Sequence, residues 1–452
     1  MSNEKKYLKF RNKIGYGIGY GGYAMTSSLI MNFTLLVMTD SIGLNAGIIG
    51  TLMMVSKVFD GISDVLFGTM IDRTNTRMGK ARPWMFGAGF GIAICTILTF
   101  VIPPEMNDIL KYAWFFIFYT VYNSVFATAV GISFNSLTVL ITKNPTERVQ
   151  LGVYSFMFGL GFQMVIVAIT VPIAASIGWA PIAIIYSLIG VLLNVVSVYS
   201  VKELPPEELL DEKVEEEKND EKKGEKIGLL VTFKYLLSNM YYIRILLINI
   251  LFTIGTNLGT ASVYYFKYVL HNENLFGLIN GSAFAAMVVG LAFAPMITKK
   301  FGIYRGNLGS YSISTIFKLL FVGGALLGNI PVMVVSNIAT SIFGSPIAGT
   351  MNAVTADIAD YQYKKTGVRI DGAMYSCVSM GTKVGAALGT GLCGWLLAAG
   401  GYVANASIQS ASTVTMLNVI YLWIPIASQI ITILLLAGLN VKKAIEQLSV
   451  TK

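Results

Sequence analysis

Residues 47–71 read GIIGTLMMVSKVFDGISDVLFGTMI, which is long and apolar enough for a membrane-spanning helix apart from three charged residues. Two of these, Asp60 and Asp64, are four positions apart, so a helix places them one turn apart on the same face. A carboxylate at mid-membrane depth costs about 2.5–3.5 kcal/mol. The third, Lys57, lies one turn before Asp60 and can neutralise at most one carboxylate. A cation that binds the pair is therefore expected.

The aspartate pair indicates a site for a proton or for a small metal ion bound by Asp60 and Asp64. Hard cations prefer oxygen ligands, and Ser63 adds a hydroxyl beside the pair, while Thr128 in a later apolar stretch can offer another. The alternative is a salt bridge to Lys57 that only holds helices together, and that bridge leaves one carboxylate without a countercharge. The sequence thus favours an ion-coupled transporter.

The composition of the chain is that of a polytopic membrane protein. Of its 452 residues, 54% are hydrophobic and 13% are charged, whereas soluble domains carry about 25% charged residues. The net charge of +9 comes from Lys and Arg in short loops beside apolar stretches, a distribution that the positive-inside rule explains. We therefore expect a lipid bilayer, and no nucleic acid, as the partner of this surface.

Twelve apolar stretches, each of about 20 residues or more, divide into two sets of six. The first set is 14–38, 47–71, 84–102, 112–141, 152–177 and 182–201. The second set is 245–267, 275–297, 308–328, 330–358, 373–399 and 415–439. Between them, residues 202–226 are too charged to fold alone and lead into a short interfacial helix. We therefore predict an all-α membrane protein with twelve transmembrane helices in two six-helix bundles, 1–201 and 245–452, joined by a cytoplasmic segment 202–244. This is the outline of the major facilitator fold.

Basic residues gather in every second loop. They occur at the N-terminus and after the second, fourth, sixth, eighth and tenth stretches, whereas the opposite loops are short and hold almost none. Because Lys and Arg favour the cytoplasmic side of a membrane, we expect a multi-pass protein of the cell membrane with both termini in the cytoplasm.

Gly17-Ile-Gly19-Tyr-Gly21-Gly22 matches the dinucleotide fingerprint G-x-G-x-x-G. That motif needs a preceding strand, whereas this one lies in the first apolar stretch, so we predict close helix packing instead. The sequence contains no Walker loop, metalloprotease motif or nucleophile elbow. An enzyme is therefore not expected, and neither is a cofactor beyond the coupling ion.

Lys383 is the only charged residue between Asp371 and the end of the twelfth stretch. If it faces a cavity, it can bind a hydroxyl or carboxylate of a solute, or move to the aspartate pair when the cation leaves. The alternative is that it reaches the membrane surface along its aliphatic stem. Lys318, in the ninth stretch, leaves the same two possibilities open.

A second group of charges lies at the cytoplasmic ends of the apolar stretches. Asp357 and Asp360 end the tenth stretch, and salt bridges from them to Arg77 or Arg148 would close an inward gate. The alternative is ordinary helix capping and solvation. The predicted gate residues are Asp72, Arg77, Arg148, Asp357, Asp360 and Arg369.

Motifs in both halves support a family assignment. In the first half they are Lys57-Val-Phe-Asp60-Gly-Ile-Ser-Asp64, Gly68 and Asp72-Arg-Thr-Asn-Thr-Arg-Met-Gly79-Lys-Ala-Arg82-Pro83-Trp84. In the second half they are Ala356-Asp357-Ile-Ala-Asp360-Tyr361, Thr366-Gly367-Val-Arg369, Tyr375-Ser376, Lys383 and Gly400-Gly401-Tyr402. In this order and spacing they resemble the glycoside–pentoside–hexuronide:cation symporter family, which includes melibiose permease.

The resemblance implies roles for individual residues. Asp60 and Asp64 match the acids that bind the coupling Na⁺, Li⁺ or H⁺ in the family, and Thr128 matches a threonine of that site. Lys383 matches a functional lysine. The galactoside-binding positions differ, because family carboxylates, a tryptophan and an arginine are replaced here by Ala24, Gly131, Asn135 and Phe156. We therefore do not expect a galactoside, and we predict Lys383, Asn135 and Ser379 as solute-binding residues.

The leading hypothesis is a cation-coupled symporter that carries a sugar or glycoside by alternating access. Two alternatives stay open. The solute can be a non-sugar molecule that is amphiphilic or acidic, or the chain can be a non-transporting sensor built on the same fold.

Overall fold

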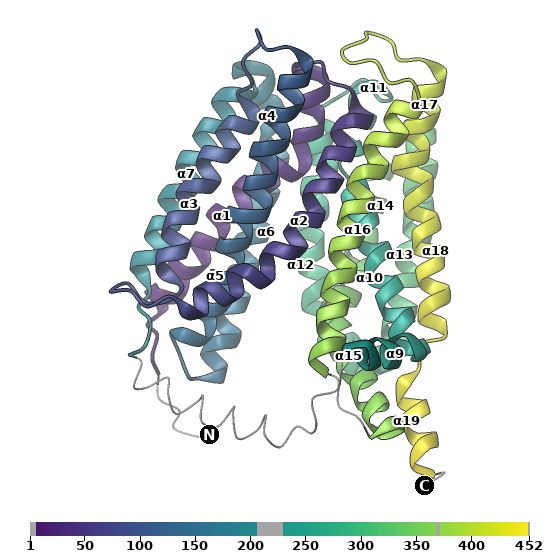
Figure 1. The fold of residues 1–452 in the computed structure, drawn as a ribbon. Coiled ribbons are helices and arrows are strands. Elements are labelled where there is room, and N and C mark those ends of the chain that lie inside the picture. The colour runs from purple at the N-terminus through teal and green to yellow at the C-terminus, as the bar shows by residue number, and fades with distance from the viewer. Residues whose placement is uncertain (1–5, 206–228, 368–370, 451–452) are drawn as a thin grey trace. The chain divides into compact units, whose positions relative to one another are not determined.

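A computed structural model of the chain describes residues 6–205, 229–367 and 371–450. Within these ranges every regular element is helical, apart from an isolated bridge between Thr76 and Gly79 (Figure 1). The predicted all-α class is therefore confirmed. Most helices begin a few residues before the predicted apolar stretch, because helix ends include polar residues that a hydropathy pattern does not mark. Several end one or two residues before the predicted stretch does.

The first six predicted stretches each correspond to one helical segment. These segments are α1 (Phe10–Leu36) with its π-helical end η1 (Val37–Ser41), α2 (Ala46–Arg73), α3 (Arg82–Phe100), α4 (Asp108–Val121) continued through the π-helical turn η2 (Tyr122–Ala127) into α5 (Thr128–Leu140), α6 (Pro145–Ile177) and α7 (Trp179–Ser200).

The second set follows the same pattern. After α9 (Leu229–Ser238), which lies in the predicted interfacial segment, come α10 (Met240–Leu258) with α11 (Ala261–Tyr268), α12 (Leu275–Phe301), α13 (Ile303–Leu326), α14 (Ile330–Gly344) with α15 (Pro346–Thr366), α16 (Asp371–Ala399), and α17 (Ala411–Asn418) continued through η3 (Val419–Trp423) into α18 (Ile424–Ala437). A further short helix, α19 (Val441–Val450), ends the described chain and was not predicted.

Ten helical segments in the described residues are long and apolar enough to cross a membrane. The two predicted stretches outside this group are α2 and α16, and both are helical over their whole length. In α2, Lys57, Asp60 and Asp64 lower the hydropathy, and these charged residues are the reason for functional interest in that helix.

The described chain divides into two compact units. The first contains Met1–Leu209, Asn257–Ala285 and Thr390–Ile420, and the second contains Leu210–Thr256, Ala286–Gly389 and Tyr421–Lys452. The predicted boundaries of two six-helix bundles remain a prediction. The aspartate pair, Asp60 and Asp64, lies within the first unit.

Glycines bring α1 close to α6 and α7 in the first unit. A Cβ atom at Gly19 would lie 2.1 Å from the Cβ of Ser197, and one at Gly17 would lie 2.6 Å from the ring of Phe158. Only hydrogen fits at these contacts. The G-x-G-x-x-G segment is therefore a helix-packing surface, as predicted.

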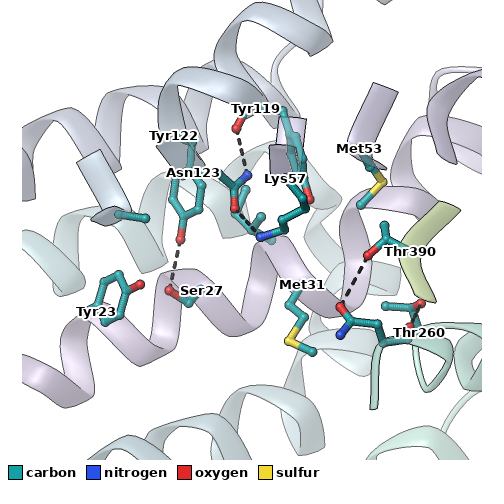
Figure 2. A pocket seen from close by; sticks show the side chains of 13 residues that line it. Tyr23, Ser27, Met31, Met53, Lys57, Tyr119, Tyr122, Asn123, Thr260 and Thr390 are labelled. Atoms are coloured by element: carbon teal, nitrogen blue, oxygen red, sulfur yellow. Dashed lines mark hydrogen bonds between the residues drawn. The ribbon is translucent and has the colours of Figure 1, made fainter. Parts of the chain in front are cut away.

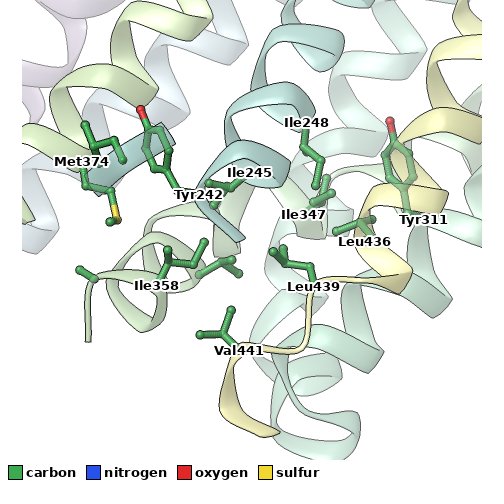
Figure 3. Close-up of a cluster of buried hydrophobic side chains, with 13 residues drawn as sticks. Tyr242, Ile245, Ile248, Tyr311, Ile347, Ile358, Met374, Leu436, Leu439 and Val441 are labelled. Atoms are coloured by element: carbon green, nitrogen blue, oxygen red, sulfur yellow. The ribbon is translucent and has the colours of Figure 1, made fainter. Parts of the chain in front are cut away.

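The second unit has an apolar core of its own (Figure 3). Tyr242 from α10, Ile358 from α15 and Leu436 from α18 are all buried there, together with Val441 at the start of α19. A hydrogen bond of 2.9 Å from Asn239 Nδ2 to a buried glutamine, Gln362, fixes the beginning of α10 against α15. Burial of Val441 explains why α19 packs against this unit.

Candidate functional site

The side chains of Asp60, Ser63 and Thr128 lie together where α2 packs against α5. The hydroxyl of Thr128 donates a hydrogen bond to Asp60 Oδ1 at 2.8 Å, and Ser63 Oγ lies 3.4 Å from Thr128 Oγ1. Ser63 also donates to the main-chain oxygen of Asp60 at 3.0 Å. Carboxylate and hydroxyl oxygens therefore converge from two helices, as a hard cation requires.

Asp64 follows Asp60 by one turn of α2 and is half-buried. The structure thus brings together three of the four predicted cation ligands by direct contacts and keeps the fourth on the same helix. That these four residues bind Na⁺, Li⁺ or H⁺ remains a prediction.

The π-helical turn η2 directs two more polar side chains toward α2 and α1. Lys57 Nζ donates to Asn123 Oδ1 at 2.8 Å, and Asn123 Nδ2 donates to the main-chain oxygen of Tyr119 at 2.8 Å. The hydroxyl of Tyr122 lies 3.1 Å from that of Ser27 on α1. Such turns occur frequently at functional sites, and no hydrophobic periodicity marks them in a sequence.

These residues line a cavity of about 160 Å³ (Figure 2). It is smaller than the roughly 300–1,000 Å³ that is usual for sites of drug-sized ligands. Figure 2 shows the ammonium of Lys57 pointing to Asn123, beside Tyr119 and Met53. Every lining residue belongs to the first unit. The lining residues are Tyr23, Ser27, Ile30, Met31, Met53, Lys57, Tyr119, Tyr122, Asn123, Ala127, Asn257, Thr260 and Thr390.

A second cavity, of about 240 Å³, shares Tyr23, Ser27 and Met31 with the first. Ala24 and Phe156 also line it. These are two of the positions at which the sequence differs from galactoside-binding relatives. The second cavity is therefore lined by hydroxyl, amide and apolar groups, including two positions where the resemblance implies charged residues in galactoside-binding members of the family.

The predicted solute-binding residues lie elsewhere. Asn135 is exposed on α5, Ser379 is exposed on α16, and Lys383 is half-buried on α16 in the second unit. They are not among the described residues that line either cavity, so their role remains a prediction. Lys318 Nζ lies 4.4 Å from the ring centroid of Phe321, a cation–π contact within the second unit.

Two of the predicted gate residues make local contacts, and two are exposed. Arg148 Nε donates to the main-chain oxygen of Thr142 at 3.0 Å, and Asp357 accepts a hydrogen bond of 2.8 Å from the hydroxyl of Tyr304. Arg77 and Asp360 are exposed. Arg369 and the side chain of Asp72 lie outside the described residues. The gate therefore remains a prediction.

An ion pair between η1 and α11 was not predicted from the sequence. Asp40 Oδ2 accepts hydrogen bonds from Lys267 Nζ at 2.5 Å and from the hydroxyl of Tyr268 at 2.6 Å. The hydroxyl of Tyr402 also donates to this carboxylate, and the side chain of Asn405 donates to the main-chain oxygen of Asp40. Only 6% of the Asp40 side chain is exposed.

Aromatic contacts surround this ion pair. The rings of Tyr264 and Tyr268 pack edge-to-face on Tyr402, with centroids 5.3 and 5.6 Å away. The hydroxyl of Tyr264 lies 2.8 Å from that of Thr39. Asp40 and Lys267 each lie at the end of a predicted apolar stretch, where a charge is ordinary, so no pattern in the sequence indicates that they pair.

Glu203 was also missed. Its carboxylate accepts hydrogen bonds from the main-chain N–H groups of Lys80, Ala81 and Arg82 at 2.7, 3.0 and 3.0 Å. A negative charge at the start of a helix satisfies free N–H groups and interacts favourably with the helix dipole. Glu203 therefore fixes the Asp72–Trp84 motif at the beginning of α3.

Comparison with known proteins matches residues 15–443 to the family described as MFS/sugar transport protein. The isoprimeverose transporter of Lactiplantibacillus pentosus is 28% identical over 433 residues, which cover 93% of this chain and 87% of that protein. The putative glycoside/cation symporter YagG of Escherichia coli is 26% identical over 431 residues, which cover 93% of this chain and 89% of that protein.

Solved structures match the fold. The D-xylose-proton symporter gives a TM-score of 0.64 at 14% identity, covering 96% of this chain and 98% of its own. The nucleoside transporter NupG gives a TM-score of 0.62 at 12% identity, and the match covers 95% of this chain and 99% of that chain. At these identities the likeness concerns the fold alone, and it confirms the predicted major facilitator fold.

The family match also confirms that the chain is a transporter and not an enzyme, and a multi-pass membrane protein. It spans nearly the whole sequence, residues 15–443. The chain therefore belongs to the MFS/sugar transport protein family, the glycoside–pentoside–hexuronide:cation symporters of the major facilitator superfamily.

Proposed function

We propose that this protein is a cation-coupled symporter that carries a sugar or glycoside through the cell membrane by alternating access. The observation that supports this most directly is the hydrogen bond between Thr128 and Asp60, close to the cavity lined by Lys57 and Asn123. It assembles oxygen ligands inside a helix bundle, where an isolated carboxylate is costly.

The coupling ion would bind to Asp60, Asp64, Ser63 and Thr128. Na⁺ and Li⁺ are hard cations that suit these oxygens, and a proton can neutralise either carboxylate. The membrane potential contributes about 2.3 kcal/mol per charge for each 100 mV, so an inward-moving cation can drive accumulation of a neutral solute.

The solute would bind in the cavity lined by Ser27, Lys57, Tyr122 and Asn123. Hydroxyl, amide and ammonium groups there offer donors and acceptors to a hydroxyl-rich molecule, and Met31 and Met53 offer apolar surface. Relatives named for isoprimeverose and for glycosides favour a sugar. Lys383, Asn135 and Ser379 would approach the solute at another stage of the transport cycle.

An acidic sugar is the second candidate solute. Lys57 is the charged residue among those that line the cavity, and an ammonium favours a carboxylate or sulfonate. Relatives in Escherichia coli and Salmonella typhimurium are named as putative sulfoquinovose importers.

Alternating access would require the predicted bundles, 1–201 and 245–452, to move relative to each other. The cluster of Asp40 with Lys267 and Tyr402 would close the extracellular side. The predicted cytoplasmic gate would close the other side. The basic loops favour both termini in the cytoplasm.

Counterflow and gradient-driven uptake in proteoliposomes test the proposal. The panel contains isoprimeverose, a neutral hexoside, a hexuronic acid and sulfoquinovose, each with an inward Na⁺ gradient, a Li⁺ gradient or a proton gradient. We expect one class of solute to accumulate with one ion, and Asp60→Asn to abolish accumulation. Asp108→Asn is the matched control, because Asp108 is 78% exposed. Equal gradient-driven uptake by Asp60→Asn and the unaltered protein would overturn the proposed coupling.

A further inference from the structure

We propose that Asn123 is the positioning residue that couples the cation site to the solute cavity, an inference that rests on the proposed symport. Its side chain and its main-chain oxygen contact different sites. The amide binds Lys57 at the cavity, and the carbonyl oxygen accepts from Thr128 at the cation site.

On the cavity side, Asn123 is held from two directions. Its Oδ1 accepts from Lys57 Nζ at 2.8 Å, and its Nδ2 donates to the main-chain oxygen of Tyr119 at 2.8 Å. The amide therefore determines where the ammonium of Lys57 lies in the cavity (Figure 2). Since Tyr122 precedes it in the same turn, the position of the Tyr122 hydroxyl near Ser27 depends on the same backbone.

On the cation side, two groups of Thr128 reach the same carbonyl oxygen. The main-chain N–H of Thr128 donates to Asn123 O, which is the hydrogen bond that defines the π-helical register. The hydroxyl of Thr128 lies 3.1 Å from Asn123 O and 2.8 Å from Asp60 Oδ1. A hydroxyl has one proton, so it can serve either acceptor fully, but not both.

A bound cation changes which acceptor the Thr128 hydroxyl donates to. At Asp60 it occupies the carboxylate oxygens and takes a lone pair of Thr128 Oγ1, and the hydroxyl proton then turns to Asn123 O. The second hydrogen bond strengthens the π-helical register, which holds Asn123, Lys57 and Tyr122 in position for the solute. Cation binding therefore raises solute affinity without direct contact between the two ligands.

The alternative explanation for coupling is the direct electrostatic interaction between Lys57 and Asp60, which lie one turn apart on α2. In that case the cation at Asp60 would act on Lys57 in the cavity without Asn123. This explanation predicts that coupling survives loss of the Asn123 amide, because both charges remain. The two explanations therefore differ in the behaviour of an Asn123 variant.

The test measures solute binding to purified protein at zero and saturating Na⁺, Li⁺ or proton concentration, with the solute panel above as the probe. The ratio of the two affinities is the coupling factor. We expect Asn123→Ala to reduce this factor by about tenfold, within the usual range of 5–150, while the cation affinity measured without solute changes less than twofold. Asn123→Asp keeps an acceptor for Lys57 and should restore most of the coupling.

Ser124→Ala is the matched control, since Ser124 is buried in the same turn but its hydroxyl donates to Ser56 O at 3.4 Å. It should leave the coupling factor unchanged. A full coupling factor in Asn123→Ala would overturn this inference and leave the symport standing. A parallel loss of cation affinity and thermal stability in Asn123→Ala would show a merely structural role and would also overturn it. If no cation changes solute binding in the unaltered protein, the proposed function fails, and the inference fails with it.

Discussion

Lys267 Nζ donates a hydrogen bond of 2.5 Å to Asp40 Oδ2, although 227 residues separate the two in the chain. The Asp40 side chain is 6% exposed and that of Lys267 is 24% exposed. Together with the hydroxyls of Tyr268 and Tyr402, this ion pair joins the end of the first span to α11 and to the segment after α16.

Removal of one partner should destabilise the protein strongly. Lys267→Met leaves the buried carboxylate of Asp40 without its countercharge, and such changes cost about 3–5 kcal/mol. We therefore expect a clear fall in the thermal unfolding temperature of the purified protein. Asp40→Asn in the same chain removes the uncompensated charge and should restore at least half of the loss. Additive effects of the two substitutions would contradict a coupled pair.

Lys267→Met should also increase access to the cavity from outside the cell. In a chain whose native cysteines are replaced by serine, Ser27→Cys places a thiol in the cavity lining. If the ion pair closes the extracellular side, Lys267→Met should raise the rate of labelling of this thiol by an impermeant maleimide severalfold. Lys111→Met is the control, because Lys111 contacts the exposed Asp108 at 3.9 Å. Unchanged labelling with Lys267→Met would argue against a gate.

Thr128→Val should weaken cation binding without removing a charge. The substitution keeps the side-chain volume but deletes the hydroxyl that contacts Asp60 at 2.8 Å. Thr128 Oγ1 would also be a ligand of the bound cation. Its loss should therefore raise the cation concentration for half-maximal uptake by about tenfold or more. Thr138→Val on the same helix is the control, since the Thr138 hydroxyl contacts Phe134 O and Tyr16. An unchanged cation dependence would exclude Thr128 from the site.

Glu203→Ala should destabilise the loop between α2 and α3. It leaves the N–H groups of Lys80, Ala81 and Arg82 without their acceptor, and loss of a helix cap costs about 0.5–2 kcal/mol. Glu203→Gln keeps one acceptor oxygen and should lose less. Faster proteolysis at the loop, compared between the two variants, measures the effect. Equal resistance of Glu203→Ala and the unaltered chain would show that the cap does not stabilise the loop.

The requirement for glycine at position 79 is explained by the tertiary structure. Its φ is +109°, and a Cβ atom there would lie 2.3 Å from Cδ of Glu203. The sequence places this glycine in a recognisable motif. Only the structure shows that Glu203, more than 120 positions away, occupies the space.

The sequence by itself determined the helices and the common face of Asp60 and Asp64 in the predicted cation site. Apolar stretches of bilayer length set the twelve spans, since a helix is the structure that satisfies its own backbone in lipid. The spacing of Asp60 and Asp64 set their common face, because the helical period is a local property. Thr128 was named from the sequence as a further hydroxyl ligand, a role that the resemblance also implies, and the structure places its hydroxyl at Asp60.

The tertiary structure alone decided the ion pair of Asp40 with Lys267 and the contact of Lys57 with Asn123. Each joins segments far apart in the chain, and hydropathy does not encode which ends meet. The turns η1 and η2 add a second reason. A π-helical turn inserts a residue into the helical period, so the directions of Asp40 and Asn123 cannot be read from the 3.6-residue repeat that fixes Asp60 and Asp64.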